Sequence, residues 1–140
     1  MKNRWRVLLL VLWIIGILFP YYFMRRFSFA YQIGFDLVFK SDVTHVVMHI
    51  FLYAVLAWLV SLVFSKKNKL ISPFIVVSVS LCISVLQEAI QLITIKSPAG
   101  IDDIFDILVD LSGAAIGIIV FRWQRRKITN KKPKDSSKLT

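Results

Sequence analysis

The feature that most constrains this chain is the stretch at residues 45–64, which contains no Asp, Glu, Lys or Arg. A helix needs about 20 predominantly apolar residues to cross a bilayer, and this stretch has that length. The chain has 140 residues and is 57% hydrophobic, whereas soluble domains are about 45–50% apolar. Its mean hydropathy is +0.69. Because one short domain cannot bury this much apolar surface within itself, we expect lipid to cover part of it.

Four apolar runs predict an all-α membrane protein, a four-transmembrane-helix bundle with helices at about residues 7–24, 43–64, 70–95 and 102–121. We expect one transmembrane domain at residues 1–126. A basic, disordered tail is predicted at residues 127–140. Residues 27–41 are too short and too polar to span, and their aromatic side chains indicate either an interfacial segment or a re-entrant loop.

The distribution of basic residues predicts the orientation of the bundle. Four spans place both termini on one side, and if that side is cytoplasmic it holds all but four of the 18 Lys and Arg. The four on the outside are Arg25, Arg26, Lys40 and Lys96. This bias satisfies the positive-inside rule. The net charge of +10 is therefore attributed to topology and to contact of the tail with anionic lipid, and we expect no nucleic-acid partner.

Acidic residues gather in residues 87–117, which hold five of the eight in the chain: Glu88, Asp102, Asp103, Asp106 and Asp110. Acidic side chains inside apolar helices are costly unless they are paired or hydrated, so they are candidates for function. In the predicted topology, the polar patches of the second, third and fourth helices all reach the outer face. With a rise of about 1.5 Å per residue, His49, Glu88 and Asp110 lie about 10–12 Å inside their helix ends. We therefore expect one shallow pocket in the outer leaflet.

Helical spacing selects the side chains of this pocket, because residues three or four apart share one face. The selected residues are Asp42, His45, His49, Tyr53, Glu88, Gln91, Asp103, Asp106 and Asp110. Gly113 and Gly117 form a GxxxG pattern, which allows a neighbouring helix to pack closely. Structural roles are the alternative, since Asp42 and Asp102 can cap helices and a serine such as Ser84 commonly bonds its own backbone.

Histidines and carboxylates in one pocket supply the chemistry of an acid–base site or of a metal site. His49 beside a carboxylate could act as a general base, and His49, Glu88 and Asp106 are the candidate catalytic residues. The same residue types bind Zn²⁺ and other divalent metals. No HExxH motif is present, so we favour a metal-free pocket, and the cofactor is unknown. Whether the chain is an enzyme stays open.

These residues resemble the VanZ-like family of small bacterial membrane proteins. Three motifs carry the resemblance: H-x-x-x-Y-x-x-L at residues 49–56, E-x-x-Q at residues 88–91, and D-x-x-x-N-x-x-G-x-x-x-G at residues 106–117. Asp110 stands in place of the family's Asn. The family's Arg between the second and third motifs is missing, and Lys96 is the nearest cation.

The resemblance implies a multi-pass protein of the bacterial cytoplasmic membrane with a role in the cell envelope. The family is associated with low-level resistance to the glycopeptide teicoplanin. We therefore expect the pocket to bind a lipid, a lipid-linked cell-wall component or the glycopeptide. The alternative hypothesis is a membrane-embedded enzyme, with or without a metal, that acts on a lipid-linked substrate. A proton-coupled transporter is disfavoured because the sequence contains no inverted repeat.

Overall fold

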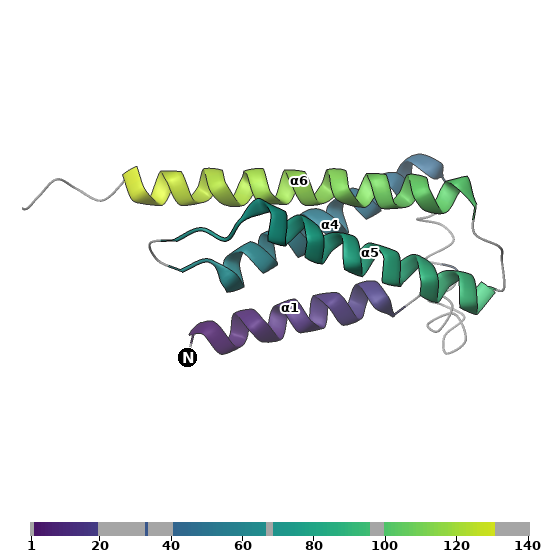
Figure 1. Cartoon of the computed structure of the whole chain (residues 1–140), viewed down its shortest axis with the longest axis horizontal. Helices are drawn as coiled ribbons and strands as arrows, with labels where there is room; N and C mark the ends of the chain where they lie inside the picture. The colour runs from purple at the N-terminus through teal and green to yellow at the C-terminus, as the bar shows by residue number, and fades with distance from the viewer. Residues whose placement is uncertain (1, 20–32, 34–40, 67–68, 96–99, 131–140) are drawn as a thin grey trace, which may run out of the picture.

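The computed structural model describes residues 2–19, 33, 41–66, 69–95 and 100–130. Within these residues, four helices follow in the order α1 (Lys2–Leu18), α4 (Asp42–Phe64), α5 (Pro73–Ile95) and α6 (Ile101–Asn130). The helices lie side by side along the long axis of the molecule, and each runs opposite to the one before it (Figure 1). The predicted all-α architecture is confirmed for this part of the chain.

Three of the helices, α4, α5 and α6, are long and apolar enough to cross a membrane. The chain is therefore a multi-pass membrane protein. Helix α1 has 17 residues, and at about 1.5 Å per residue its length of about 25 Å falls short of a hydrocarbon core of about 30 Å. Three of the four predicted spans are thus supported, and the one nearest the amino terminus stays a prediction.

The bounds of α1, the start of α5 (at Pro73 rather than residue 70) and the end of α6 differ from those that the apolar runs predicted. Helix α1 begins at Lys2 and ends at Leu18, just before the Pro20 position, consistent with the restriction that proline places on the residue before it. Helix α6 passes the expected end at Phe121 and continues to Asn130, because the Arg, Gln and Lys that follow are good helix formers. Residues 127–130 of the predicted tail are therefore helical. Residues 20–24 and 131–140, and almost all of residues 27–41, lie outside the described residues.

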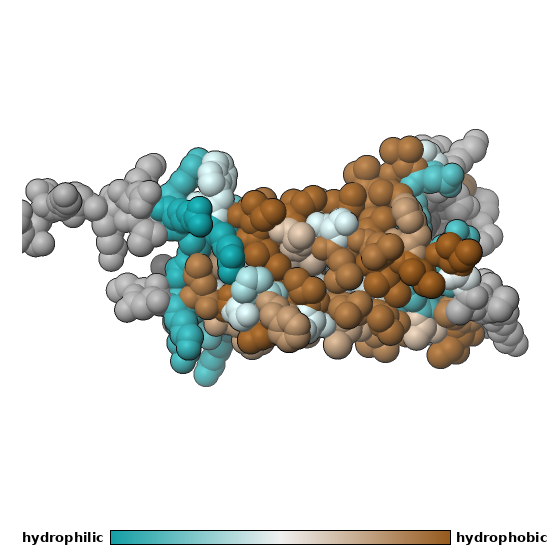
Figure 2. All heavy atoms as spheres, turned by 45° about the horizontal axis from the view of Figure 1, so that its top comes forward, coloured by the Kyte–Doolittle hydropathy of each residue, from teal (hydrophilic) through white to brown (hydrophobic). Residues whose placement is uncertain are grey.

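The bundle is organised around α4, which packs against α1, α5 and α6. Its buried side chains form the centre of the core with residues of the neighbouring helices: Tyr53, Leu56, Ala57 and Val60 on α4, Val76 on α5, and Ala114 and Ile118 on α6. Many large apolar side chains outside this core are exposed. Figure 2 shows them as a brown belt around the middle of the visible face. Such a surface is suited to lipid.

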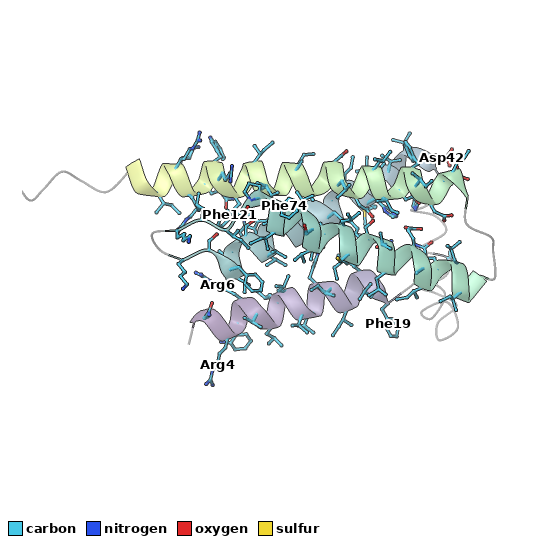
Figure 3. The ribbon with its side chains drawn as sticks, in the orientation of Figure 1. Arg4, Arg6, Phe19, Asp42, Phe74 and Phe121 are labelled. Atoms are coloured by element: carbon cyan, nitrogen blue, oxygen red, sulfur yellow. The ribbon has the colours of Figure 1, made fainter. Side chains whose placement is uncertain are left out.

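Among the described residues, the charged side chains at the two ends of the bundle differ in sign. We call the end with Arg4, Arg6, Lys66 and Arg125 the basic end, and the end with Asp42 and the first turn of α6 the acidic end. Figure 3 places Arg4 and Arg6 far from Asp42 along the long axis. At the basic end, Arg125 Nη2 donates to the Lys66 carbonyl at 2.8 Å and so ties α6 to the turn after α4.

Candidate functional site

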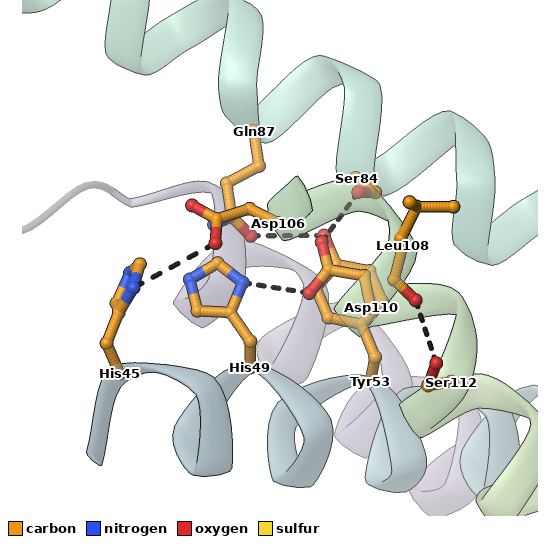
Figure 4. Close-up of polar contacts among 9 residues, drawn as sticks. All are labelled: His45, His49, Tyr53, Ser84, Gln87, Asp106, Leu108, Asp110 and Ser112. Carbon is orange, nitrogen blue, oxygen red and sulfur yellow. Dashed lines mark hydrogen bonds and ion pairs between the residues drawn. The ribbon is translucent and has the colours of Figure 1, made fainter. Parts of the chain in front are cut away.

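Polar side chains from three helices meet inside the bundle near its acidic end (Figure 4). Asp110 of α6 is fully buried, and its Oδ1 lies 2.8 Å from Nδ1 of the buried His49 on α4. Its other oxygen, Oδ2, accepts a hydrogen bond from Ser84 Oγ on α5 at 2.6 Å. Asp110 therefore joins α4 and α5 through both of its carboxylate oxygens.

A second contact between α4 and α5 lies one helical turn further along α4. The Tyr53 hydroxyl donates to Gln87 Oε1 at 3.0 Å, and both side chains are buried. Tyr53 is placed beside His49 because residues four apart in a helix share one face. The buried polar groups therefore form two adjacent layers, one with His49 and Asp110 and one with Tyr53 and Gln87.

The cluster becomes more accessible toward the acidic end. His45 Nδ1 lies 3.9 Å from Asp106 Oδ1, and their side chains are 40% and 17% exposed. The rings of His45 and His49 are in edge contact, with centroids 4.4 Å apart. A continuous series of histidine and carboxylate side chains thus runs from the partly exposed His45 to the buried Asp110 (Figure 4).

Glu88 on α5 is 4% exposed, and its Oε1 is buried with no hydrogen-bond partner. Buried polar atoms are nearly always hydrogen-bonded, so an unpaired carboxylate oxygen needs an explanation. Glu88 groups with His49 and Asp110 so that one potential ligand atom from each lies within 4.8 Å of the others. His45, His49 and Asp106 form a second such group.

An open, groove-like cavity of about 480 Å³ lies beside this cluster between α5 and α6. Its lining is mostly apolar and includes two carboxylates: Val85, Glu88, Ala89, Leu92, Gly100, Ile101, Asp103, Ile104 and Ile107. Asp103 also holds the start of α6, because its Oδ2 accepts a hydrogen bond from the Gly100 N–H at 2.6 Å. This contact corresponds to the backward half of a capping box.

Close packing of α6 on α4 brings the polar groups of the two helices into reach. A Cβ atom added to Gly113 would overlap the Ile50 carbonyl oxygen, and one added to Gly117 would overlap the Ala54 carbonyl oxygen. Only glycine therefore permits this separation of the two backbones. One turn from Gly113, the same approach sets Asp110 against His49.

The structure brings six of the nine predicted pocket residues together and places the other three elsewhere. His45, His49, Tyr53, Glu88, Asp106 and Asp110 come together in the interior or beside it. Asp42 is exposed in the first turn of α4, and Gln91 is only partly buried, further along α5 than Gln87. Asp103 lies at the edge of the cavity.

The family model described as VanZ/LLP1 matches residues 6–125 of the chain. The chain belongs to the VanZ family. The resemblance inferred from the motifs is thus confirmed, and the match covers all the residues that build the site. No curated protein and no solved structure matches the chain.

Two polar residues of this VanZ family member were missed by the sequence analysis. The spacing puts Ser84 on the polar face with Glu88, and a bond to its own backbone was the preferred alternative to a site role; its hydroxyl in fact donates to Asp110. Gln87 was passed over in favour of Gln91, although Ser80, Ser84 and Gln87 recur at intervals of four and three residues. All three are buried. That spacing was the available signal for the buried face of α5.

Proposed function

We propose that this VanZ family member binds a lipid-linked cell-wall component at the outer face of the bacterial cytoplasmic membrane, and that this binding underlies a role in the envelope and in teicoplanin resistance. The supporting observation is the mostly apolar cavity that opens beside a cluster of histidine and carboxylate side chains at the acidic end. Apolar walls suit a lipid chain, and carboxylate oxygens accept hydrogen bonds from sugar hydroxyls and peptide N–H groups.

The proposed orientation places both termini and the basic end in the cytoplasm, with α1 as a fourth span. It follows from the basic residues near the start of α1, in the turn after α4 and at the end of α6, since Lys and Arg are enriched in cytoplasmic segments. The same residues would contact anionic lipid. A reporter fused after Lys69 should be cytoplasmic and one fused after Gly100 extracytoplasmic. The reverse result would overturn this orientation.

The function is tested by teicoplanin susceptibility in the native host after deletion and complementation. His49→Ala and Asp106→Asn should leave the strain as susceptible as the deletion strain, although both proteins reach the membrane in normal amounts. Asp102→Asn is the matched control, because it removes the same charge from an exposed position on the same helix. Wild-type behaviour of both site variants would refute the proposal.

The alternative of a membrane enzyme acting on a lipid-linked substrate is not favoured by the family match. A binding role requires only the cavity and the hydrogen-bonding groups beside it. We therefore assign no reaction to His49, Glu88 or Asp106.

A further inference from the structure

We propose that His49, Glu88 and Asp110 bind one divalent transition-metal ion between α4, α5 and α6. One potential ligand atom from each side chain lies within 4.8 Å of the other two. The three side chains come from three different helices, and all three are buried. The inference deepens the proposed function, because it rests on the same site and concerns how that site holds its ligand.

The first argument is the balance of charge. Glu88 is 4% exposed and Asp110 is 0% exposed, so two carboxylates lie in the apolar interior of the bundle. Among the described residues, α4 and α5 contain no Lys or Arg, and the basic residues of α1 and α6 lie at the opposite end of the bundle. A protonated His49 would balance only one carboxylate. A divalent cation with a neutral His49 balances both carboxylates, whereas without a cation Glu88 has to be protonated to avoid the cost of an unpaired buried charge.

The second argument is the unpaired Glu88 Oε1. Both oxygens of Asp110 have partners, His49 at 2.8 Å and Ser84 at 2.6 Å. The buried Oε1 of Glu88 has none. A cation or a water molecule would supply the missing partner, and of the two only a cation also balances the charge of the carboxylate. The hydrogen-bond network of the cluster therefore leaves one carboxylate oxygen, Glu88 Oε1, available to an ion.

The donor types indicate the class of ion. One imidazole nitrogen and two carboxylate oxygens suit Zn²⁺ and neighbouring transition metals better than Ca²⁺ or Mg²⁺, which prefer oxygen ligands alone. Around a tetrahedral Zn²⁺ the ligand atoms lie about 3.3 Å apart, so the side chains would rotate to this spacing, and an ion between His49 Nδ1 and Asp110 Oδ1 would replace their hydrogen bond. The Ser84 hydroxyl would hold the Asp110 carboxylate in place as an outer-shell partner.

Three protein ligands leave a fourth position on a tetrahedral ion. Glu88 belongs both to the ion-binding cluster and to the lining of the cavity. An oxygen atom of the bound cell-wall component, such as a phosphate or carboxylate oxygen, would fill that position. The charged side chains of the site are mostly acidic and would repel an anionic group. The bound ion would offset this repulsion.

The experiment measures metal in the full-length protein, purified in detergent, stripped with chelator and dialysed against ZnCl₂. We expect about one Zn²⁺ per wild-type chain by mass spectrometry of the metal. The thermal midpoint should rise by about 5 °C or more with Zn²⁺ and return with chelator. Glu88→Gln keeps the size of the side chain and should lose the bound ion. The control Asp102→Asn should retain it.

A wild-type protein with neither bound Zn²⁺ nor a thermal shift would overturn the inference, and so would equal Zn²⁺ in wild type and in folded Glu88→Gln. If Glu88→Gln does not yield a monodisperse protein, the wild-type content and shift decide alone. These readouts involve no envelope ligand. If the protein binds no Zn²⁺ but His49 is still required for teicoplanin resistance, the ion inference fails and the proposed function stands. If the protein binds Zn²⁺ but His49 is not required for resistance, only the proposed function fails.

Discussion

The interface between α4 and α6 has two halves that are built in opposite ways. In the glycine half, Gly113 and Gly117 lie directly against the backbone of α4. In the polar half, nearer the acidic end, Asp106 and Asp110 face His45 and His49. The glycine half needs no charged group, and small residues of this kind let membrane helices pack by van der Waals contact. The polar half carries four ionisable side chains.

The glycine half holds the two helices together, whereas the polar half is better suited to binding a ligand. A buried ion pair contributes little net stability, because the desolvation of both charges offsets their attraction, and apolar residues of similar volume often do as well. The glycine half already gives the two helices a close contact. The polar half therefore adds little to the stability of the bundle, and its histidines and carboxylates are better explained by the binding of a ligand. The two halves are still linked, since close packing at Gly113 sets the distance between His49 and Asp110.

The largest expected loss of stability comes from breaking the polar half on one side only. Asp110→Ala leaves a buried His49 and the Ser84 hydroxyl without their partner, so the free energy of unfolding should fall by about 3–5 kcal/mol. Unfolding in detergent micelles measures it. Asp102→Ala, at an exposed position, should change the value by less than about 0.5 kcal/mol. Equal effects of the two substitutions would show that Asp110 is not paired as described.

A smaller loss is expected in the glycine half. Gly117→Ala forces a methyl group against the Ala54 carbonyl and should destabilise the bundle by about 1–3 kcal/mol. Gly16→Ala is the matched control, because nothing lies within 4 Å of a Cβ at that position. The control should be neutral or should stabilise α1 by up to about 1 kcal/mol. Equal changes in the unfolding free energy of Gly117→Ala and Gly16→Ala would contradict the close contact between Gly117 and the α4 backbone.

The smallest loss is expected at the layer next to His49. Tyr53→Phe removes the hydroxyl that donates to Gln87, so the free energy of unfolding should fall by about 1 kcal/mol. Tyr53→Phe combined with Gln87→Met removes both partners and should recover part of that loss. A double-mutant cycle measures the coupling between the two side chains. A coupling energy near zero would show that the hydrogen bond does not contribute to the fold.

The sequence predicts the features that depend on one helix at a time. Apolar runs place α4, α5 and α6, because each run is long enough to cross a bilayer. Spacing along α4 places His45, His49 and Tyr53 on one face, where their contacts with α5 and α6 are found. These features follow from the helical repeat alone.

Features that depend on how two helices are rotated relative to each other could not be predicted from the helical repeat. The side chains of Gln87 and Glu88 differ by about 100° around α5, and spacing alone does not say which faces Tyr53. The serine hydroxyls on α5 could bond their own backbone or another helix, and only tertiary packing sets Ser84 against Asp110. The end of α6 was misplaced because hydropathy marks where a membrane span ends, whereas the helix continues through basic residues.

The central claim is that the polar half is a binding site whose pairing is not needed for the fold. The most direct measurement is the teicoplanin susceptibility of a strain whose protein carries both His49→Leu and Asp110→Leu. The imidazole and the carboxylate are replaced together and only the Ser84 hydroxyl loses a partner, so the unfolding free energy should fall by no more than about 1–3 kcal/mol. We expect this folded variant to be as susceptible as the deletion strain. Full resistance with the folded variant would contradict the claim.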